Sequence, residues 1–129
     1  MLKKLKYMKN TTFLIVEDDE LTREVLRKTL TGLNYKNIIS CTNGFEAIDI
    51  IRRETIDICI MDIELNNKLD GVDTAKIVGD KTKVIFTSSH KESETFKRIS
   101  EANSHGFLSK PITSQMVELA IDLALNAKS

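Results

Sequence analysis

Short apolar runs alternate along this chain with segments whose apolar residues recur at helical spacing. The runs are rich in β-branched residues and bounded by polar ones, which is typical of buried strands. We expect strands at residues 12–16, 37–41, 56–62, 83–87 and 106–109. We expect helices from about residue 19 to 32, after Asn43, from Gly71, from about 92 to 102, and from 113 or 114 through about 127. This alternation predicts an α/β doubly wound, five-stranded parallel sheet with five helices on both faces, in a single domain.

Polar residues and glycine mark the expected helix ends. Asn43 and either Thr113 or Ser114 can accept a hydrogen bond from the first turn of the helix that follows. Gly32 is a natural end for the first helix, and Asn103 is predicted to be a left-handed C-cap for the fourth.

The composition is ordinary for one globular domain. Of 129 residues 41% are hydrophobic and 29% are charged, and 19 basic residues balance 19 acidic ones. Zero net charge gives no support for nonspecific binding to nucleic acid, and no apolar run approaches the length of a membrane span. The basic start, MLKKLKYMKN, lacks the long apolar stretch of a signal peptide. We therefore expect residues 1–11 to be a solvated lead-in and residues 12–128 to form the domain.

Cys41 and Cys59 both fall in predicted strands. Two thiols in apolar segments of a chain without an export signal are most simply reduced core residues, and we expect the protein to be cytoplasmic.

Three predicted strands end at charged residues. Glu17 and Asp18 follow the first strand, Asp62 ends the third, and Lys110 follows the fifth. A charge at the mouth of a buried strand is costly unless a partner or a chemical purpose accompanies it. Because the carboxyl ends of parallel strands meet at one edge of the sheet, we expect these residues to form one site.

Each of these residues also has a purely structural interpretation. An aspartate after a strand is usually a loop or capping residue, and acids at a helix start usually serve the helix dipole. Taken singly, the structural interpretation is favoured for every one of them. Their coincidence at one edge of one sheet favours a functional site instead.

The grouped residues suit phosphoryl chemistry. Three carboxylates repel one another unless a cation lies between them, and oxygen ligands favour Mg²⁺. Asp62 is then a plausible nucleophile toward phosphorus, with Lys110 as a positive contact. A hydroxyl from the run Thr87-Ser88-Ser89 can donate a hydrogen bond to a phosphoryl oxygen.

The chain resembles the receiver domain of two-component response regulators. The segments FLIVEDDE, IMDIELNNKLDG, VIFTSS and GFLSKP occur in the order typical of that family and cover nearly the whole chain from Thr12 onward. The resemblance implies a flavodoxin-like, receiver-type fold. It also implies a phosphoprotein of a phosphorelay, phosphorylated on one aspartate by a sensor histidine kinase or a histidine phosphotransfer protein.

Carried across by position, the resemblance assigns roles to the acids and the lysine. Asp62 becomes the phosphoacceptor and Lys110 the invariant lysine. Asp18 and Asp62 become Mg²⁺ ligands, Glu17 a ligand through water, and Glu64 a ligand through its backbone carbonyl.

The resemblance also implies a switch. Counting back from Lys110 without a gap makes Ser88 the switch hydroxyl, with Thr87 as the alternative, and Phe107 the switch aromatic. As Ser88 moves toward the phosphate, the ring of Phe107 would turn inward. That motion would remodel the face formed by the fourth helix, the fifth strand and the fifth helix.

We expect two contact surfaces, the first from the resemblance and the second from the apolar residues of the last helix. The first helix, around Leu21 to Arg27, would contact the kinase or phosphotransfer protein. The last helix is apolar over a wide arc, either because it binds an output partner or a second copy or because it is deeply buried.

Two other functions are compatible with the residues. A pseudo-receiver would be a docking module without phosphorylation, but such domains usually lose an acid or the lysine. A small Mg²⁺-dependent phosphohydrolase, similar to haloacid-dehalogenase-like enzymes, would use Asp62 as nucleophile and Glu64 as second acid. We favour a phosphoacceptor that is not a turnover enzyme, in which Glu64 and His90 occupy positions that tune the lifetime of the aspartyl phosphate.

Overall fold

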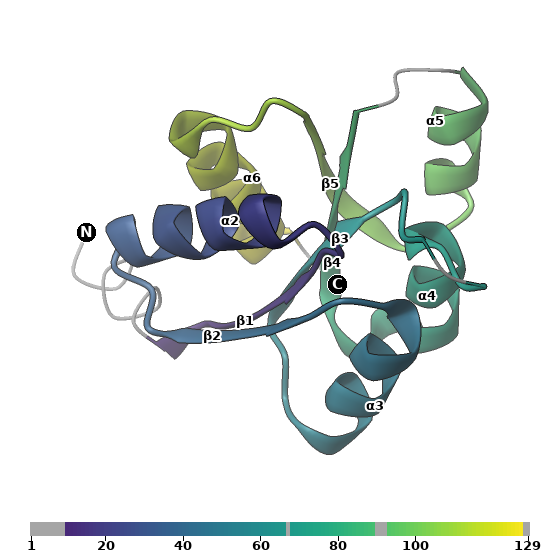
Figure 1. Ribbon diagram of the computed structural model, residues 1–129, viewed down its shortest axis with the longest axis horizontal. Helices are drawn as coiled ribbons and strands as arrows, with labels where there is room; N and C mark the ends of the chain where they lie inside the picture. Colours follow the sequence, from purple (N-terminus) through teal and green to yellow (C-terminus); the bar gives the residue numbers. More distant parts are fainter. Residues whose placement is uncertain (1–9, 67, 90–92, 128–129) are drawn as a thin grey trace.

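The computed structural model describes residues 10–66, 68–89 and 93–127. Five strands form one sheet in the order β2-β1-β3-β4-β5, and all four pairings are parallel (Figure 1). The strands are β1 (Thr12–Val16), β2 (Asn37–Cys41), β3 (Ile58–Asp62), β4 (Lys83–Ser88) and β5 (Ser104–Ser109). The strand order reverses between β1 and β3, which is where open α/β sheets place their ligands.

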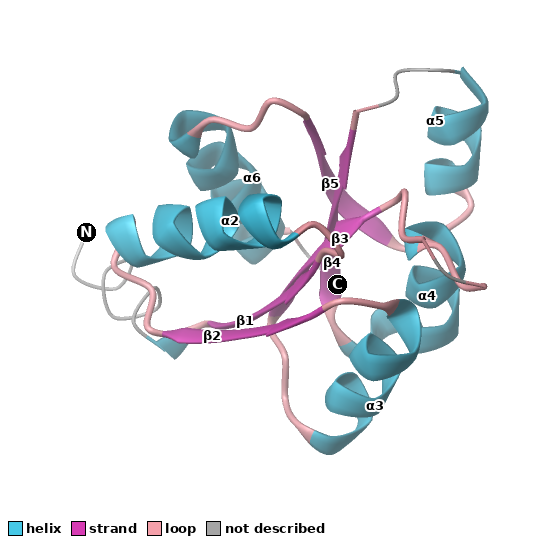
Figure 2. Ribbon diagram, viewed as in Figure 1, coloured by secondary structure: helices cyan, strands magenta, loops and turns pink. Residues whose placement is uncertain are grey.

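Helices cover both faces of the sheet (Figures 1 and 2). On one face lie α2 (Glu20–Gly32) and α6 (Ser114–Asn126). On the other lie α3 (Gly44–Arg53), α4 (Gly71–Val78), which runs into the short 3-10 helix η1 (Gly79–Lys81), and α5 (Ser93–Ser100). The predicted doubly wound α/β fold is confirmed.

Residues of the central strands alternate between two hydrophobic cores. Phe13 and Ile15 of β1 pack with α2 and α6, whereas Leu14 and Val16 pack with α3 and α4. All four are fully buried. Because helices cover both faces, the central strands are almost continuously apolar instead of alternating with polar residues.

The helix starts are confirmed, and one predicted cap is wrong. Asn43 and Thr113 cap α3 and α6, each accepting a hydrogen bond from the backbone N–H three residues on. α2 ends at Gly32 as predicted, and the left-handed residue after it is Asn34, with φ 74°. Asn103 does not have a positive φ, so it is not the left-handed cap that we expected.

Both cysteines are free thiols buried in the sheet, as predicted. Burial raises the pKa of Cys41 to about 12 and raises the pKa of Cys59 as well. Each thiol is therefore unreactive near neutral pH, since the thiolate is the nucleophile. Among the described residues we find no helix that combines the length and apolarity needed to cross a membrane.

Asp57 and Lys83 tie together the amino ends of the strands. The backbone N–H of Asp57 donates to the carbonyl of Thr12 (3.0 Å), and its carboxylate accepts from the N–H of Thr12 (2.8 Å). The Lys83 N–H donates to the Asp57 carbonyl (3.2 Å). The Nζ of Lys83 donates to the carbonyls of Ala124 (2.8 Å) and Ala127 (3.0 Å) at the end of α6. β3 therefore begins at Ile58, two residues later than predicted, because Asp57 serves this network.

Replacing Lys83 by methionine tests this connection. α6 has no basic residue in its last turn, so Lys83 supplies the cation that favours its carbonyl end. We expect Lys83→Met to lower the free energy of unfolding by about 1–2 kcal/mol, measured by urea denaturation. Lys36→Met, at an exposed lysine, is the control, and equal effects of the two substitutions would contradict the role of Lys83.

Candidate functional site

Three carboxylates meet at the carboxyl edge of the sheet. Glu17 and Asp18 follow β1 directly, and Asp62 is the last residue of β3. One oxygen of each lies within 4.8 Å of the others. Glu17 is 1% exposed and Asp62 3% exposed, while Asp18 is half-buried. The predicted grouping is thus present, and its two most buried members sit at the switch point of the strand order.

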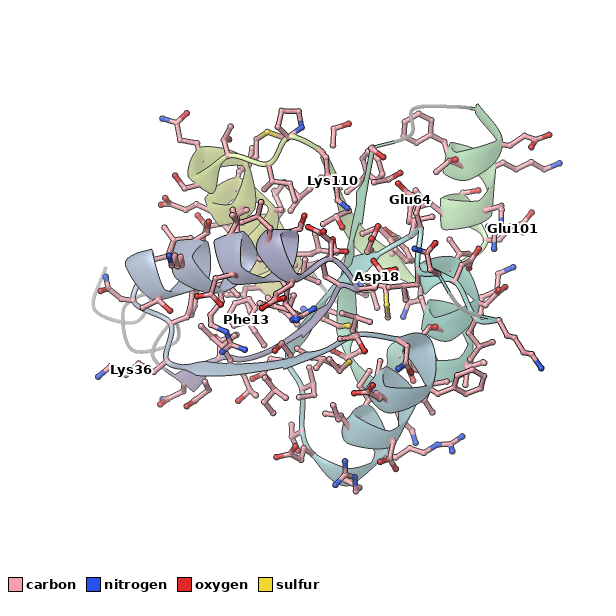
Figure 3. All side chains as sticks on the ribbon, in the orientation of Figure 1. Phe13, Asp18, Lys36, Glu64, Glu101 and Lys110 are labelled. Atoms are coloured by element: carbon pink, nitrogen blue, oxygen red, sulfur yellow. The ribbon has the colours of Figure 1, made fainter. Side chains whose placement is uncertain are left out.

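Lys110 reaches this group from the residue after β5. Its Nζ lies 3.0 Å from Oε1 of Glu17 and 3.4 Å from Oδ2 of Asp62. Its backbone N–H donates to the carbonyl of Ser88 (2.9 Å), which fixes the start of its side chain beside β4. In Figure 3, Lys110, Asp18 and Glu64 project into the region between the ends of the strands. One lysine therefore contacts both buried carboxylates.

Backbone N–H groups orient the carboxylates. Asp19 donates to Oε2 of Glu17, Glu64 to Oδ1 of Asp62, and Asn66 to Oδ2 of Asp18, each at 3.1 Å. Hydrogen bonds to an ionised acceptor are among the stronger ones in proteins. The donors of the last two bonds belong to the loop after β3, so this loop sets the geometry of the acids.

The charge balance of the group is incomplete. Burial, assisted by the hydrogen bond and the charge of Asp62, raises the pKa of Glu17 to about 7. The N–H of Asp19 and the ammonium of Lys110 act the other way without cancelling this effect. Two buried acids held by one lysine thus leave room for a second positive charge.

The donor set fits a hard divalent cation. Carboxylate oxygens are the ligands that Mg²⁺ and Ca²⁺ prefer, and a partly exposed acid such as Asp18 leaves positions open to water. A cation among these oxygens would favour the ionised form of Glu17, which burial and Asp62 disfavour. The role predicted for the Glu64 carbonyl stays a prediction.

The start of α4 packs directly on the backbone of Asp62. A Cβ at residue 71 would overlap the carbonyl oxygen of Asp62, so only glycine fits there. The N–H of Gly71 donates to the carbonyl of Ile63 (3.1 Å). The loop that carries Glu64 is thereby closed against the end of β3.

The loop is also connected to α5. Asp70 caps α4 and accepts two hydrogen bonds from Arg98 of α5, at 2.7 and 3.1 Å. Burial works against the ionised form of Asp70, yet the bonds and charge of Arg98 hold its pKa below the ordinary value. This pair links the residues after Asp62 to a helix that also packs on β5.

The two candidate hydroxyls are both buried and occupy successive positions. Thr87 lies opposite Asp62 in the register of β3 and β4, and Ser88 lies opposite Ser109 of β5. Successive side chains of a strand point to opposite faces, so Thr87 follows Ile85 toward α2 and α6, and Ser88 follows Phe86 toward α4 and α5. Ser88 therefore shares its face with α5.

Phe107 packs on the same face as Ser88. Its ring lies 5.3 Å from that of Phe96 in α5, edge to face with planes at 69°. Phe107 is partly buried against the core under α3 and α4, and Phe96 is 47% exposed. The predicted switch aromatic thus sits between the sheet and α5.

Sequence reasoning missed one contact beside Asp62. The carboxylate of Glu64 accepts hydrogen bonds from the N–H (3.0 Å) and hydroxyl (3.1 Å) of Ser89. This contact joins the loops after β3 and β4. The two partners are 25 residues apart, so local sequence pattern does not predict their contact. The only signal in the sequence was the hydroxyl run Thr87-Ser88-Ser89. His90, the other residue predicted to tune the site, lies outside the described residues.

Comparison with known proteins agrees with this geometry. The family model for the response regulator receiver domain matches residues 13–122. A polar-differentiation response regulator, DivK of Brucella anthropi, is 30% identical over 105 residues, covering 78% of this chain and 84% of that protein. The cyclic di-GMP phosphodiesterase of Thermotoga maritima is 30% identical over 116 residues, covering 88% of this chain and 31% of that protein.

A solved structure matches at a similar level. The signal receiver domain of a modulated diguanylate cyclase from Desulfovibrio desulfuricans G20 superposes with a TM-score of 0.80 and 35% identity, covering 88% of this chain and 92% of that one. Among the curated relatives the extents differ, since the chain spans 31% of the Thermotoga protein and half of the C4-dicarboxylate response regulator DctR of Priestia megaterium.

The raised pKa of Glu17 predicts a pH dependence of stability. Folding favours the protonated form, so this stabilisation is complete below the ordinary pKa and is lost as the pH rises through about 7. With a chelator present, we expect the free energy of unfolding to fall by roughly 2–3 kcal/mol between about pH 5 and about pH 8, and Glu17→Gln to remove this fall. Urea denaturation across that range, with exposed Glu54→Gln as control, measures it. An unchanged slope in Glu17→Gln would refute the assignment.

Proposed function

We propose that this chain, which belongs to the family of response regulator receiver domains, accepts a phosphoryl group on Asp62 and alters its α5–β5–α6 surface in response. One observation carries the proposal. Asp62 is a nearly inaccessible carboxylate at the switch point of the sheet, with Lys110 and two further acids around it. A structural carboxylate would not require two additional acids in contact with it.

The phosphoryl donor in this proposal is the phosphohistidine of a sensor histidine kinase or a phosphotransfer protein. An oxygen of Asp62 attacks phosphorus, the new P–O bond forms, the P–N bond breaks, and the departing imidazole nitrogen takes up a proton from solvent. Such a transfer depends on positioning and charge neutralisation more than on a base. The N–H of Glu64 orients Asp62, and the ammonium of Lys110 is placed to contact a phosphoryl oxygen.

Asp18 and Asp62 would hold Mg²⁺ directly, with Glu17 through a water molecule and Glu64 through its carbonyl. When bound, Mg²⁺ neutralises negative charge on the phosphoryl oxygens. Nζ of Lys110 lies 3.0 Å from Oε1 of Glu17, and this contact would hold the lysine at the site for an incoming phosphoryl group.

The response is proposed to run through Ser88 and Phe107. Ser88 would donate its hydroxyl to the new phosphoryl group, and the loop after β4 would follow it. That loop leads into α5, which contacts the ring of Phe107 through Phe96. The α5–β5–α6 surface would then bind an output partner or a second copy of the chain.

The kinase or phosphotransfer protein is proposed to bind beside α2. Leu21 and Val25 of α2 are exposed, 75% and 45%, although both are apolar. They line a hollow together with Pro111 and Ile112, next to Lys110. An apolar surface adjoining the reactive edge suits a donor protein whose histidine must approach Asp62.

Phosphorylation can be tested directly by intact mass. We expect one phosphoryl adduct after incubation with acetyl phosphate and Mg²⁺. The adduct should be absent in Asp62→Asn and after chelation, because the nucleophile or the charge neutralisation is then missing. Asp49→Asn, at an exposed aspartate of α3, is the matched control and should be modified like the original chain.

Two other results, one from that experiment and one from a separate turnover assay, would indicate a different function. No adduct while Mg²⁺ still binds would make the chain a pseudo-receiver that acts by docking alone. Continuous release of phosphate from a generic phosphate ester, lost in Asp62→Asn, would identify a phosphohydrolase.

The switch hydroxyl is tested by paired substitutions. We expect Ser88→Ala to be phosphorylated but to show little of the change in the Phe107 ring signals that phosphorylation causes by NMR. Thr87→Val, whose side chain points to the opposite face, should keep that change. The reverse pattern would make Thr87 the switch hydroxyl.

A further inference from the structure

The outer face of α6 combines exposed leucines with acids. Leu119 and Leu123 are 61% and 62% exposed and lie one turn apart. Glu118 and Asp122 precede them with the same spacing, so the acids form a stripe beside the leucines. No basic residue occurs between Ser114 and Asn126. The face therefore favours a partner that is both apolar and basic.

The acidic stripe lies close enough to Tyr35 to act on its hydroxyl. Tyr35, which contacts the ring of Phe13 at 4.5 Å between centroids, is buried. Burial raises the pKa of Tyr35 to about 12, and the charges of Asp122 and Glu118 act in the same direction. The two acids thus lie near the first residues of β1.

Hydrogen bonds connect the start of β1 with the end of α6. Thr11 is buried, 2% exposed, which fixes the chain just before β1. From Thr12 a hydrogen-bonded path runs through Asp57 and Lys83 to the last carbonyls of α6. Nine residues can extend about 30 Å, whereas the 13 residues of α6 span about 20 Å. The preceding segment is therefore longer, when extended, than α6.

The composition of residues 1–9 complements the face. The segment MLKKLKYMK contains four lysines and no acid, and its remaining residues, Met1, Leu2, Leu5, Tyr7 and Met8, are apolar or aromatic. Lysines pair with the acidic stripe while apolar side chains cover the leucines. Opposite charge on the two surfaces favours their contact.

We propose that residues 1–9 bind back onto the outer face of α6, with lysines against Glu118 and Asp122 and apolar side chains over Leu119 and Leu123. The segment is tethered at Thr11, so its local concentration at α6 is high without any strong individual contact.

A second copy is a poorer occupant of this face. A symmetric pairing of α6 with α6 would bring the same acids of both copies together, which is repulsive. The basic segment has the opposite charge and is already tethered nearby. Because α6 is part of the surface assigned above to an output partner, the bound segment would compete with that partner.

A spin label on the segment tests the proposal in the intact 129-residue chain. Lys4→Cys gives one accessible thiol, because Cys41 and Cys59 are buried. A nitroxide at this cysteine should broaden the amide NMR signals of Leu119 and Leu123 strongly. The signal of Phe45, in α3 on the opposite face, should keep its intensity and serves as the reference.

Charge reversal then separates specific binding from chance proximity. Glu118→Lys with Asp122→Lys should abolish most of the broadening, and adding Lys3→Glu with Lys6→Glu should restore it. Broadening that persists in the reversed helix, or equal effects at Phe45 and Leu119, would overturn the proposal. So would strong broadening when spin-labelled chains are mixed with separate isotope-labelled chains, since a second copy would then be the occupant.

Discussion

The burial of two carboxylates beside a single lysine is the constraint on which the rest of this structure depends. Glu17 and Asp62 are almost inaccessible to solvent, and Lys110 contacts both. Removing charges from water is costly unless the geometry of the compensating contacts is good. Three strand ends must therefore be held in register at one edge, and the parallel sheet does this because β1 and β5 both align with the strands between them.

The loops around this site are connected to one another and to α5. Gly71 lets α4 begin against the backbone of Asp62, and Asp70 binds Arg98 of α5. Glu64 joins the loop after β3 to Ser89 in the loop after β4. A new negative charge on Asp62 would act on both loops at once. A local electrostatic event can in this way bias a packed helix some distance from the acids.

The opposite edge of the sheet organises the chain differently. There Asp57 and Lys83 connect the start of β1 with the end of α6 by hydrogen bonds, and no buried group of acids is present among the described residues at this edge. The carboxyl edge gathers Glu17, Asp62 and Lys110, whereas the amino edge connects the start of β1 with the end of α6. α6 runs between the two edges, so its outer face can be influenced from either.

The sequence by itself determined the fold class, the strands to within two residues, and the residue types of the site. Apolar periodicity encodes which segments are buried, and parallel strands necessarily bring Glu17, Asp62 and Lys110 to one edge. The tertiary structure decided what depends on partners distant in sequence. The bond of Glu64 to Ser89, the pairing of Asp70 with Arg98 and the left-handed residue Asn34 after α2 are examples. Such contacts depend on side-chain directions in the packed fold, which local pattern does not specify.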